Sequence, residues 1–450
     1  MKYRKDLSNI TYERLFLIFV VIQPLIDLAT SFSLIYLKSE LTLGTIIRFL
    51  IMSSGVVYLI FNIFPNKKRM LIYLFLLFTF FTLNIFNNLI TKDPVAVTSE
   101  IKFILKSSYF IIMLFSYIVV FYKLKEATAD WYKSIEKHIV YTMGLIGAVM
   151  VLSSITNTAF NSYQYEKIGH KGWFFAGNEL GAIMSICFPI TILYALRATK
   201  TVKQIYRWIP AIILVYSLLA LGTKVGYGAA VITSLSALVM VLIEYFVLKR
   251  KEYSTNIWII TCILVGIVLY TPFSPISYNT HTHLNIIKMK EPPKQGKDST
   301  GEQPEEINEA ELQSLMLSGR DQYLSIHKEY FADAPISQKL LGMGYGGNYT
   351  DSPKLIEMDF HDLFFSFGIV GFMLYLVPII FIIIRLIWKA VIDVKKVFST
   401  ENVIIGVGIS LGFGIALFAG HVLTAPAVSI YLAILMSYIS NKINSNKTVV

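Results

Sequence analysis

The sequence predicts an all-α polytopic membrane protein with about twelve transmembrane helices. Of its 450 residues, 55% are hydrophobic and only 15% are charged, and the mean hydropathy is +0.60. Soluble chains carry about 25% charged residues and place apolar residues in amphipathic patterns, whereas this chain has uninterrupted apolar blocks. This composition excludes a disordered chain, a collagen-like chain and a disulfide scaffold. The two cysteines, Cys187 and Cys262, lie inside apolar blocks, and we interpret them as structural thiols.

Apolar blocks long enough to span a membrane recur along the chain. A helix needs about 20 residues to cross about 30 Å of hydrocarbon. We predict spans at 15–37, 41–64, 70–90, 102–122, 138–156, 173–197, 207–222, 225–248, 257–272, 361–387, 402–424 and 426–441. Nine of them lie within 1–272 and three within 361–450. The first block is too long for a cleaved signal peptide and no small-residue cleavage site follows it, so we expect an uncleaved anchor.

The distribution of Lys and Arg predicts the orientation. The alternate connections that include both termini hold 24 Lys and Arg, whereas the short connections on the other side hold six. Cytoplasmic loops are enriched in these residues, so we expect a cell-membrane protein with both termini in the cytoplasm. The even number of spans agrees with this. The net charge of +11 then faces anionic lipid headgroups, and we expect no nucleic-acid partner.

One connection, 273–360, is long, and this topology places it outside the membrane. Its 88 residues contain eight Lys/Arg and thirteen Asp/Glu, unlike the basic connections. Residues 288–307 are charged, rich in Pro and poor in apolar residues, which predicts a mobile segment. Residues 308–349 are predicted to be partly helical, with helical spacing over 308–317 and 319–331 and Ser318 placed to cap the second helix. The Gly-rich run 340–349 predicts a turn before the chain re-enters the membrane.

Two polar positions near the outer face could carry chemistry. His361 opens the tenth span, where the helix dipole disfavours a protonated imidazole and favours a neutral one able to act as a base. Asp362 follows it as a cap or an orienting partner. Arg320 lies in the first turn of a predicted helix, and a guanidinium fits a phosphate bidentately. The alternatives are an interfacial polar residue for His361 and a solvated loop arginine for Arg320.

A second group of candidates lies at outer turns. Lys224 stands in a turn with Gly222, Gly226 and Gly228, which allow close approach of a ligand; snorkelling towards headgroups is the alternative. Asn178 and Glu179 fall near the outer end of the sixth span, where a polar group is a functional candidate. Just before them, His170 and Lys171 are either interfacial or facing a ligand.

Weaker candidates are Asp27, Arg48, Lys106 and His421, which lie near or within apolar blocks. Pairing among the first three inside the membrane is as plausible as a ligand role. His281 and His283 form an isolated pair without a carboxylate at useful spacing, so we expect no metal site there. We expect no cofactor, and no phosphate-binding GxxxxGK[ST] motif occurs.

Four motifs in order resemble the O-antigen ligase and O-antigen polymerase (Wzy-type) superfamily of bacterial membrane glycosyltransferases. They are Asn178 with Gly181, Thr223 with Lys224 and Gly226, Gly319 with Arg320, and the run GMGYGG followed by FHDLFFSFGIVG. The resemblance covers roughly residues 140–440. Lys224 stands where the family usually has arginine, and Asp362 replaces the usual asparagine.

The resemblance implies a GT-C-like helical fold and metal-independent glycosyl transfer on the outer face of the membrane. The implied partners are a donor saccharide on undecaprenyl diphosphate, a glycan acceptor, a flippase and a chain-length regulator. His361 and Arg320 would be catalytic, the imidazole taking the acceptor proton and the guanidinium holding the diphosphate. Lys224, Asn178, Lys171 and Asp362 would bind or orient substrate.

The identity of the acceptor separates the possible functions. A polymerase joins lipid-linked repeat units, whereas a ligase transfers the glycan to another glycolipid or protein. The Lys-, Ile- and Asn-rich composition and the lack of cysteines at the outer face fit a low-GC Gram-positive bacterium, which lacks a lipopolysaccharide core. This favours a polymerase of a capsule, exopolysaccharide, teichuronic-acid-like or other cell-wall glycan. A transporter of the same units would place charges at the midplane of both halves, whereas most candidates here gather at the outer face.

Overall fold

The computed structural model describes residues 11–38, 42–163, 167–290 and 319–443. Over these residues the chain is helical, with one isolated bridge between Asn161 and His170 and no strand. The helices are α1 (Thr11–Ile35), α2 (Leu43–Phe61), α3 (Lys67–Thr91), α4 (Val97–Ala127), α5 (Trp131–Ile155), α6 (Gly177–Ala198), α7 (Ile209–Ala220), α8 (Lys224–Leu242), α9 (Ser254–Tyr270), α10 (Pro275–Lys290), α12 (Arg320–Asp333), α13 (Ile336–Leu341), α14 (Asp359–Ile392), α15 (Val394–Val397), α16 (Thr400–Phe418) and α17 (Pro426–Ile443).

Within the described residues, eleven helices are long and apolar enough to cross a membrane. They match the first eleven predicted spans, with short 3-10 or π segments extending α7, α8 and α9. The twelfth predicted span corresponds to α17, an 18-residue helix that ends in Asn441, Lys442 and Ile443. Because lipid offers no hydrogen bonds, the backbone polar groups of such blocks must be satisfied within helices. The prediction of a multi-pass all-α membrane protein is confirmed.

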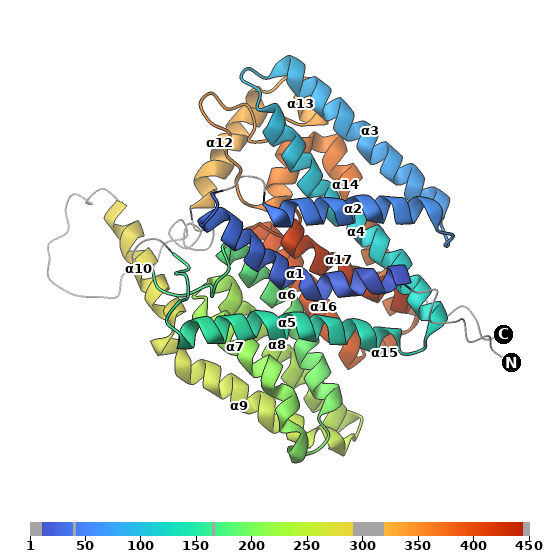
Figure 1. Ribbon diagram of the computed structural model, residues 1–450, viewed down its shortest axis with the longest axis vertical. Coiled ribbons are helices and arrows are strands. Elements are labelled where there is room, and N and C mark those ends of the chain that lie inside the picture. Colours follow the sequence, from blue (N-terminus) through green and yellow to red (C-terminus); the bar gives the residue numbers. More distant parts are fainter. Residues whose placement is uncertain (1–10, 39–41, 164–166, 291–318, 444–450) are drawn as a thin grey trace.

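The centre of the bundle is formed by α4, α6 and α17, which lie among the other helices in Figure 1. Nearly all residues of α6 and α17 are buried, including polar ones such as Ser185 and Ser437. By contrast α2, α3 and α9 expose large apolar side chains such as Phe75 and Trp258. Exposed apolar surface of this extent fits contact with lipid tails.

The predicted outer connection contains three helices in its described part. Helix α10 covers 275–290, so residues 288–290 of the segment predicted to be mobile are helical, while 291–307 lie outside the described residues. The predicted helix 308–317 and the Ser318 cap also lie outside them. Helix α12 matches the predicted helix 319–331, with Gly319 at its N-cap position. In Figure 1, α10 and α12 lie on the left, and α15, which connects α14 to α16, lies on the right.

Helix α14 is interrupted at Gly368, which has φ 63° and ψ −172°. The interruption leaves the carbonyl groups of Phe365 and Ser366 available, and they accept hydrogen bonds from the N–H groups of Met343 (2.9 Å) and Gly344 (3.0 Å). The Gly-rich turn is therefore bound directly to the outer part of α14. A continuous span over 361–387 was expected, and hydropathy alone does not reveal such a break.

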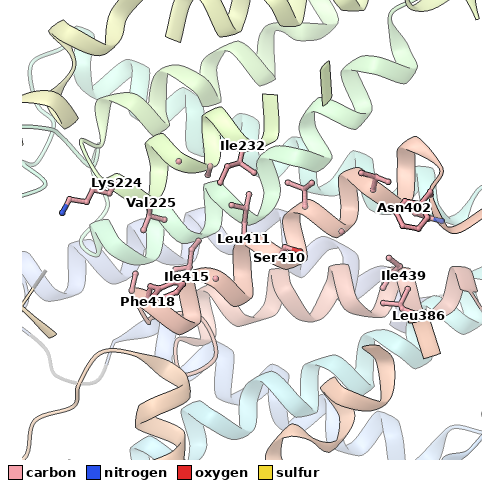
Figure 2. A pocket seen from close by; sticks show the side chains of 18 of the residues that line it. Lys224, Val225, Ile232, Leu386, Asn402, Ser410, Leu411, Ile415, Phe418 and Ile439 are labelled. Atoms are coloured by element: carbon pink, nitrogen blue, oxygen red, sulfur yellow. The ribbon is translucent and has the colours of Figure 1, made fainter. Parts of the chain in front are cut away.

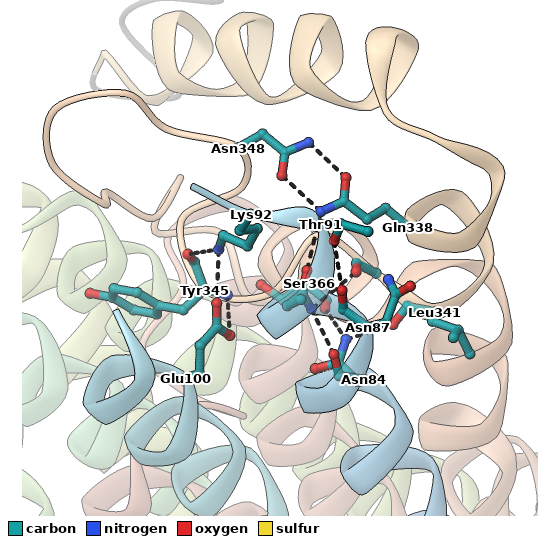
Figure 3. A network of polar contacts seen from close by, with 12 residues as sticks. Asn84, Asn87, Thr91, Lys92, Glu100, Gln338, Leu341, Tyr345, Asn348 and Ser366 are labelled. Carbon is teal, nitrogen blue, oxygen red and sulfur yellow. Dashed lines mark hydrogen bonds and ion pairs between the residues drawn. The ribbon is translucent and has the colours of Figure 1, made fainter. Parts of the chain in front are cut away.

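A polar network ties the same turn to α3 and α4 (Figure 3). The Lys92 ammonium donates to Glu100 (2.8 Å) and to the Tyr345 carbonyl (3.1 Å), and the Tyr345 N–H donates to Glu100 (2.7 Å). Asn84 donates to the carbonyls of Leu341 (2.6 Å) and Ser366 (3.0 Å). Burial of both charges is compensated by these paired contacts. The network holds the Gly-rich turn against the bundle and so fixes the position at which α14 begins.

Candidate functional site

The candidate site is built at the start of α14. Asp362 reaches back from the first turn, and its carboxylate accepts the N–H groups of Ile356 (2.8 Å) and Met358 (3.1 Å). Helix starts leave such N–H groups without intrahelical partners, and an acidic side chain in the first turn satisfies them. Asp362 is buried and holds the segment that leads into α14, which is the capping role given above as one of its two possible roles. Its predicted contact with substrate stays a prediction.

Asp359 joins the start of α14 to the loop between α16 and α17. Its carboxylate accepts the N–H groups of His421 (3.2 Å), Val422 (2.7 Å) and Leu423 (2.7 Å) and the Thr424 hydroxyl (2.6 Å). Four donors compensate the burial of this carboxylate, which is 1% exposed. The loop that carries His421 is therefore fixed to the helix that carries His361.

Glu357 lies between two cationic groups. Its Oε2 is 3.6 Å from Arg320 Nη2 and 3.7 Å from His421 Nε2. The close contact and charge of His421, together with the charges of Arg320 and Lys354, lower the pKa of Glu357 against the effect of burial. Burial lowers the pKa of His421, but Glu357, Asp359 and Glu179 outweigh it, so that pKa is raised. Both shifts favour the charged forms, Glu357 as carboxylate and His421 as imidazolium.

The backbone at this junction is unusually tight. Glu357 and His421 both have positive φ, 65° and 59°, a region that is uncommon for residues with a side chain. Gly420, with φ 66°, lies so close to the Glu357 carbonyl that a Cβ there would collide with it. Such conformations persist where surrounding contacts hold them, and they are concentrated at functional sites.

His361 lies two residues into α14 and is half-buried. Its Nδ1 is buried and has no hydrogen-bond partner among the described residues. The side chain lies within electrostatic reach of Lys328 on α12. No described group holds the ring by a hydrogen bond, and its accessible part, other than the buried Nδ1, is what a ligand can reach, as a general base requires.

Aromatic packing holds α12 beside α14. The Phe331 ring lies 5.3 Å from Phe364 and 5.6 Å from Phe365, and His327 lies 5.8 Å from Phe365. These rings belong to a small hydrophobic cluster, separate from the main core, that also includes Met343 and Ile356. The cluster positions Arg320, at the first residue of α12, next to Glu357.

Lys171, Asn178 and Lys224 come from a second set of neighbouring segments. Thr223 caps α8 by accepting the Gly226 N–H (3.1 Å), which places Lys224 at the helix start. Helix α6 meets this turn at Gly181, where a Cβ would lie 2.9 Å from Leu221. Asn178 is exposed in the first turn of α6. Lys171 lies over the Phe175 ring at 5.4 Å, and burial lowers its pKa.

The two sets meet at the loop that carries His421. Glu179, next to Asn178, contributes to the raised pKa of His421. Phe418 and Ala419 line a groove together with Lys224. The structure thus gathers Arg320, His361 and Asp362 around the start of α14, and places the α6–α8 candidates beside the same loop.

The groove runs between α8 and α16 and has a volume of about 720 Å³. Lys224 lies at one end and Asn402 at the other, with apolar side chains such as Ile232 and Leu411 between them (Figure 2). A Cβ on Gly228, Gly406 or Gly414 would meet nothing within 4 Å, so these glycines leave the groove open. Its shape and chemistry suit a long apolar chain whose polar end lies near Lys224.

Among the weaker candidates, Arg48 pairs with Asp27 inside the membrane and also donates to Gln23 (3.1 Å). The predicted intramembrane pairing is confirmed for these two. Lys106 forms no ion pair within the part of the chain that the structure describes. In the same part, no group of three or more His, Cys, Asp and Glu is arranged to hold a metal ion.

A family model described as "O-antigen ligase like membrane protein" matches residues 9–446. The chain belongs to this family. The resemblance identified from four motifs is therefore confirmed over nearly the whole chain, including the first third. A search of curated proteins found no match. Membership makes the protein a membrane glycan-processing enzyme of the glycosyltransferase type.

Sequence reasoning missed Glu357 and Asp359 and ranked His421 low. Glu357 and Asp359 stand beside His361 in the run LIEMDFHD, so acidic residues flanking a candidate base were a usable signal. His421 is 60 residues further along, and its position depends on the contact between Asp359 and the 421–424 turn. Only the fold brings it to the site.

Proposed function

We propose that the protein is a polymerase that joins undecaprenyl-diphosphate-linked oligosaccharide repeat units into a surface polysaccharide on the outer face of the membrane. Family membership supports glycan processing. The more specific assignment rests on a half-buried imidazole, an arginine and an apolar groove whose Lys224 end lies beside the same loop.

The proposed step is a glycosyl transfer between two lipid-linked glycans. The hydroxyl oxygen of the acceptor forms a bond to the anomeric carbon of the donor, and its proton passes to His361. The bond between that carbon and the diphosphate oxygen breaks, and the electron pair stays on the leaving diphosphate. Arg320 and Lys224 offset the developing negative charge, in the manner of cationic clamps on other phosphate leaving groups.

The apolar groove supplies a place for the polyprenyl chain. With Lys224 at its outer end, a chain lying between α8 and α16 would bring its diphosphate to the cationic side of the site. Asn178 and Lys171 lie on segments next to Lys224 and are proposed to contact the saccharide or the diphosphate. Asp362 is proposed to act by fixing the helix start that presents His361.

The half-buried imidazole of His361 at the start of α14, which no described group holds by a hydrogen bond, carries the proposal. The test uses purified full-length protein, undecaprenyl-diphosphate oligosaccharide, no nucleotide and EDTA, with products separated on a gel. We expect a ladder that falls about 10²- to 10⁴-fold in rate in His361→Ala, the usual effect of losing a general base. His138→Ala is the matched control, because His138 lies on α5 and, among the described residues, its side chain hydrogen-bonds only to the Ser134 carbonyl within the same helix.

A ladder that survives His361→Ala unchanged would contradict the assigned base. Transfer that appears only after another glycolipid or a protein acceptor is added would favour a ligase, to which the description of the family points. Movement of the intact lipid-linked unit across the membrane, without a new glycosidic bond, would instead favour a transporter.

A further inference from the structure

A second groove lies at the other end of the bundle, where α3 begins and α4, α14 and α17 end. We call it the basic groove. Its volume is about 1040 Å³. Arg69, Lys125, Arg385 and Lys389 are among its lining residues, and no Asp or Glu is. Its deeper wall is apolar and aromatic. This end carries the basic connections of the chain, so the charge rule places it at the cytoplasmic leaflet.

The floor of the basic groove is rigid. Pro378 in α14 has no N–H, so the carbonyl of Leu374, four residues earlier, has no helical donor. The Tyr73 hydroxyl on α3 donates to that carbonyl (3.1 Å). The Tyr73 ring in turn packs edge-on against Phe115 of α4 at 5.5 Å. Three helices are thus joined beneath an open apolar surface.

The four cations are available to a ligand. None of them forms an ion pair with a carboxylate within the described residues. Lys125 donates to the Asn441 carbonyl (3.0 Å), and Arg385 lies over the Phe381 ring at 5.2 Å. A carbonyl and a ring orient these side chains but do not neutralise them. Next to them Trp388 is 68% exposed, as aromatic residues at a membrane interface often are.

We infer that the basic groove binds an anionic phospholipid of the cytoplasmic leaflet, with its phosphate among the four cations and its acyl chains against the apolar wall. Charge complementarity selects this occupant, because a neutral lipid leaves four cations uncompensated and a soluble anion leaves the apolar wall uncovered. The site is separate from the candidate active site and binds its ligand whether or not the proposed polymerase activity is correct.

The test measures binding of labelled phosphatidylglycerol to delipidated full-length protein in neutral detergent. The groove variant is Arg385→Gln with Lys389→Gln. The control is Lys137→Gln with Lys203→Gln, which removes two exposed cations at the same end but outside the groove, neither of which forms an ion pair within the described residues. Each cation near a lipid surface contributes about fivefold to binding, so we expect about 25-fold weaker Kd in the groove variant and little change in the control.

A third variant tests the apolar wall without altering charge. Val377→Trp places a large ring at the lipid-exposed side of the groove, and we expect it to weaken phosphatidylglycerol binding while the cations remain. Size-exclusion profiles and melting temperatures identify variants that fail to fold, and in that case the single substitutions Arg385→Gln and Lys389→Gln take their place.

Competition identifies the ligand. Equal weakening in the groove and control variants, or equal affinity for phosphatidylcholine, would overturn the inference. Displacement of the label by inorganic phosphate at constant ionic strength would show a simple anion site and also overturn it. So would displacement by a polyprenyl phosphate at lower concentration than by unlabelled phosphatidylglycerol, which would assign the groove to a glycan carrier.

Discussion

The carboxylate of Glu357 holds Arg320 and His421 in one ion-pair chain. Because the pKa of His421 is raised on folding, the protonated imidazole stabilises the folded state. This contribution is complete below the pKa that His421 has in the unfolded chain, and it is lost as pH rises through its pKa in the folded protein. Because the pKa of Glu357 is lowered on folding, its carboxylate stabilises the folded state above the pKa that Glu357 has in the unfolded chain. That stabilisation is lost as pH falls through the pKa of Glu357 in the folded protein. The two residues therefore stabilise the fold most between the pKa values that Glu and His have in an unfolded chain, at about pH 5.5.

Replacing Glu357 by Gln should therefore lower stability most at about pH 5.5, and the difference from wild type should shrink as pH rises through the raised pKa of His421 and that residue loses its proton. Glu357 is 46% exposed, so after screening by solvent the loss should be at most about 1 kcal/mol. Melting temperatures over a pH series measure it. Asp351→Asn, at an exposed site in the same loop, is the control. A difference that is the same at every pH would contradict the ion-pair chain.

Candidate residues could be predicted where chemistry follows from local sequence. His361 at a helix start and Arg320 after a glycine needed only spacing and helix polarity. The contact of Glu357 with His421, by contrast, depends on two left-handed residues and on the close approach of Gly420. Those features follow from the packing of α14 against the α16–α17 loop, which no local pattern encodes.

Helix α16 uses its glycines on two different faces. A Cβ at Gly408 would lie 2.7 Å from the Ile186 carbonyl, and one at Gly412 would lie 2.9 Å from Leu432, so these two permit close packing against α6 and α17. Gly406 and Gly414 face the groove beside α8, where a Cβ would meet nothing within 4 Å. The same residue type therefore packs one side of the helix and opens the other.

Filling the groove should affect the polyprenyl chain of the proposed donor. We expect Gly414→Phe to raise the KM for an undecaprenyl donor about tenfold with kcat changed less, because apolar contacts to the chain bind substrate and transition state alike. A donor with a short prenyl chain should be insensitive. Gly266→Phe on α9 is the matched control, since a Cβ there also meets open space but lies outside the groove. Equal effects on long-chain and short-chain donors would contradict a chain-binding groove.

Most of the bundle could be predicted from hydropathy, because a long apolar segment in lipid must form a helix to satisfy its own backbone hydrogen bonds. Helix α10 was not predicted, since PISYNTHTHLNI lacks a clear apolar period. The break at Gly368 was also not predicted. It leaves carbonyl groups of α14 free to accept hydrogen bonds from the N–H groups of Met343 and Gly344, which lie more than 20 residues earlier in the chain. Hydropathy measures burial in lipid, and these two features serve contacts between the long connection 273–360 and the bundle.

Polar clusters hold the helices together at both ends of the bundle, and the cluster at the end where α6 finishes centres on Arg197. Its guanidinium pairs with Glu136 of α5 and Glu401 of α16, and Lys442 of α17 also pairs with Glu401. The Tyr438 hydroxyl donates to Glu136 (3.2 Å). The cluster joins α5 and α6 to α16 and α17, two pairs of helices that are distant in sequence, just as Lys92 and Glu100 join the Gly-rich turn to α3 and α4.

Replacing Arg197 by Met should cost about 3–5 kcal/mol, because it leaves two mostly buried carboxylates without their main partner. Differential scanning fluorimetry of the purified protein should show a clearly lower melting temperature. Arg14→Met, which removes an exposed arginine with no ion pair in the described residues, should show almost none. Adding Glu136→Gln to Arg197→Met should recover part of the loss, because the stranded charge is then removed. If the double variant melts no higher than Arg197→Met, the cluster stabilises the bundle by packing and not by charge pairing.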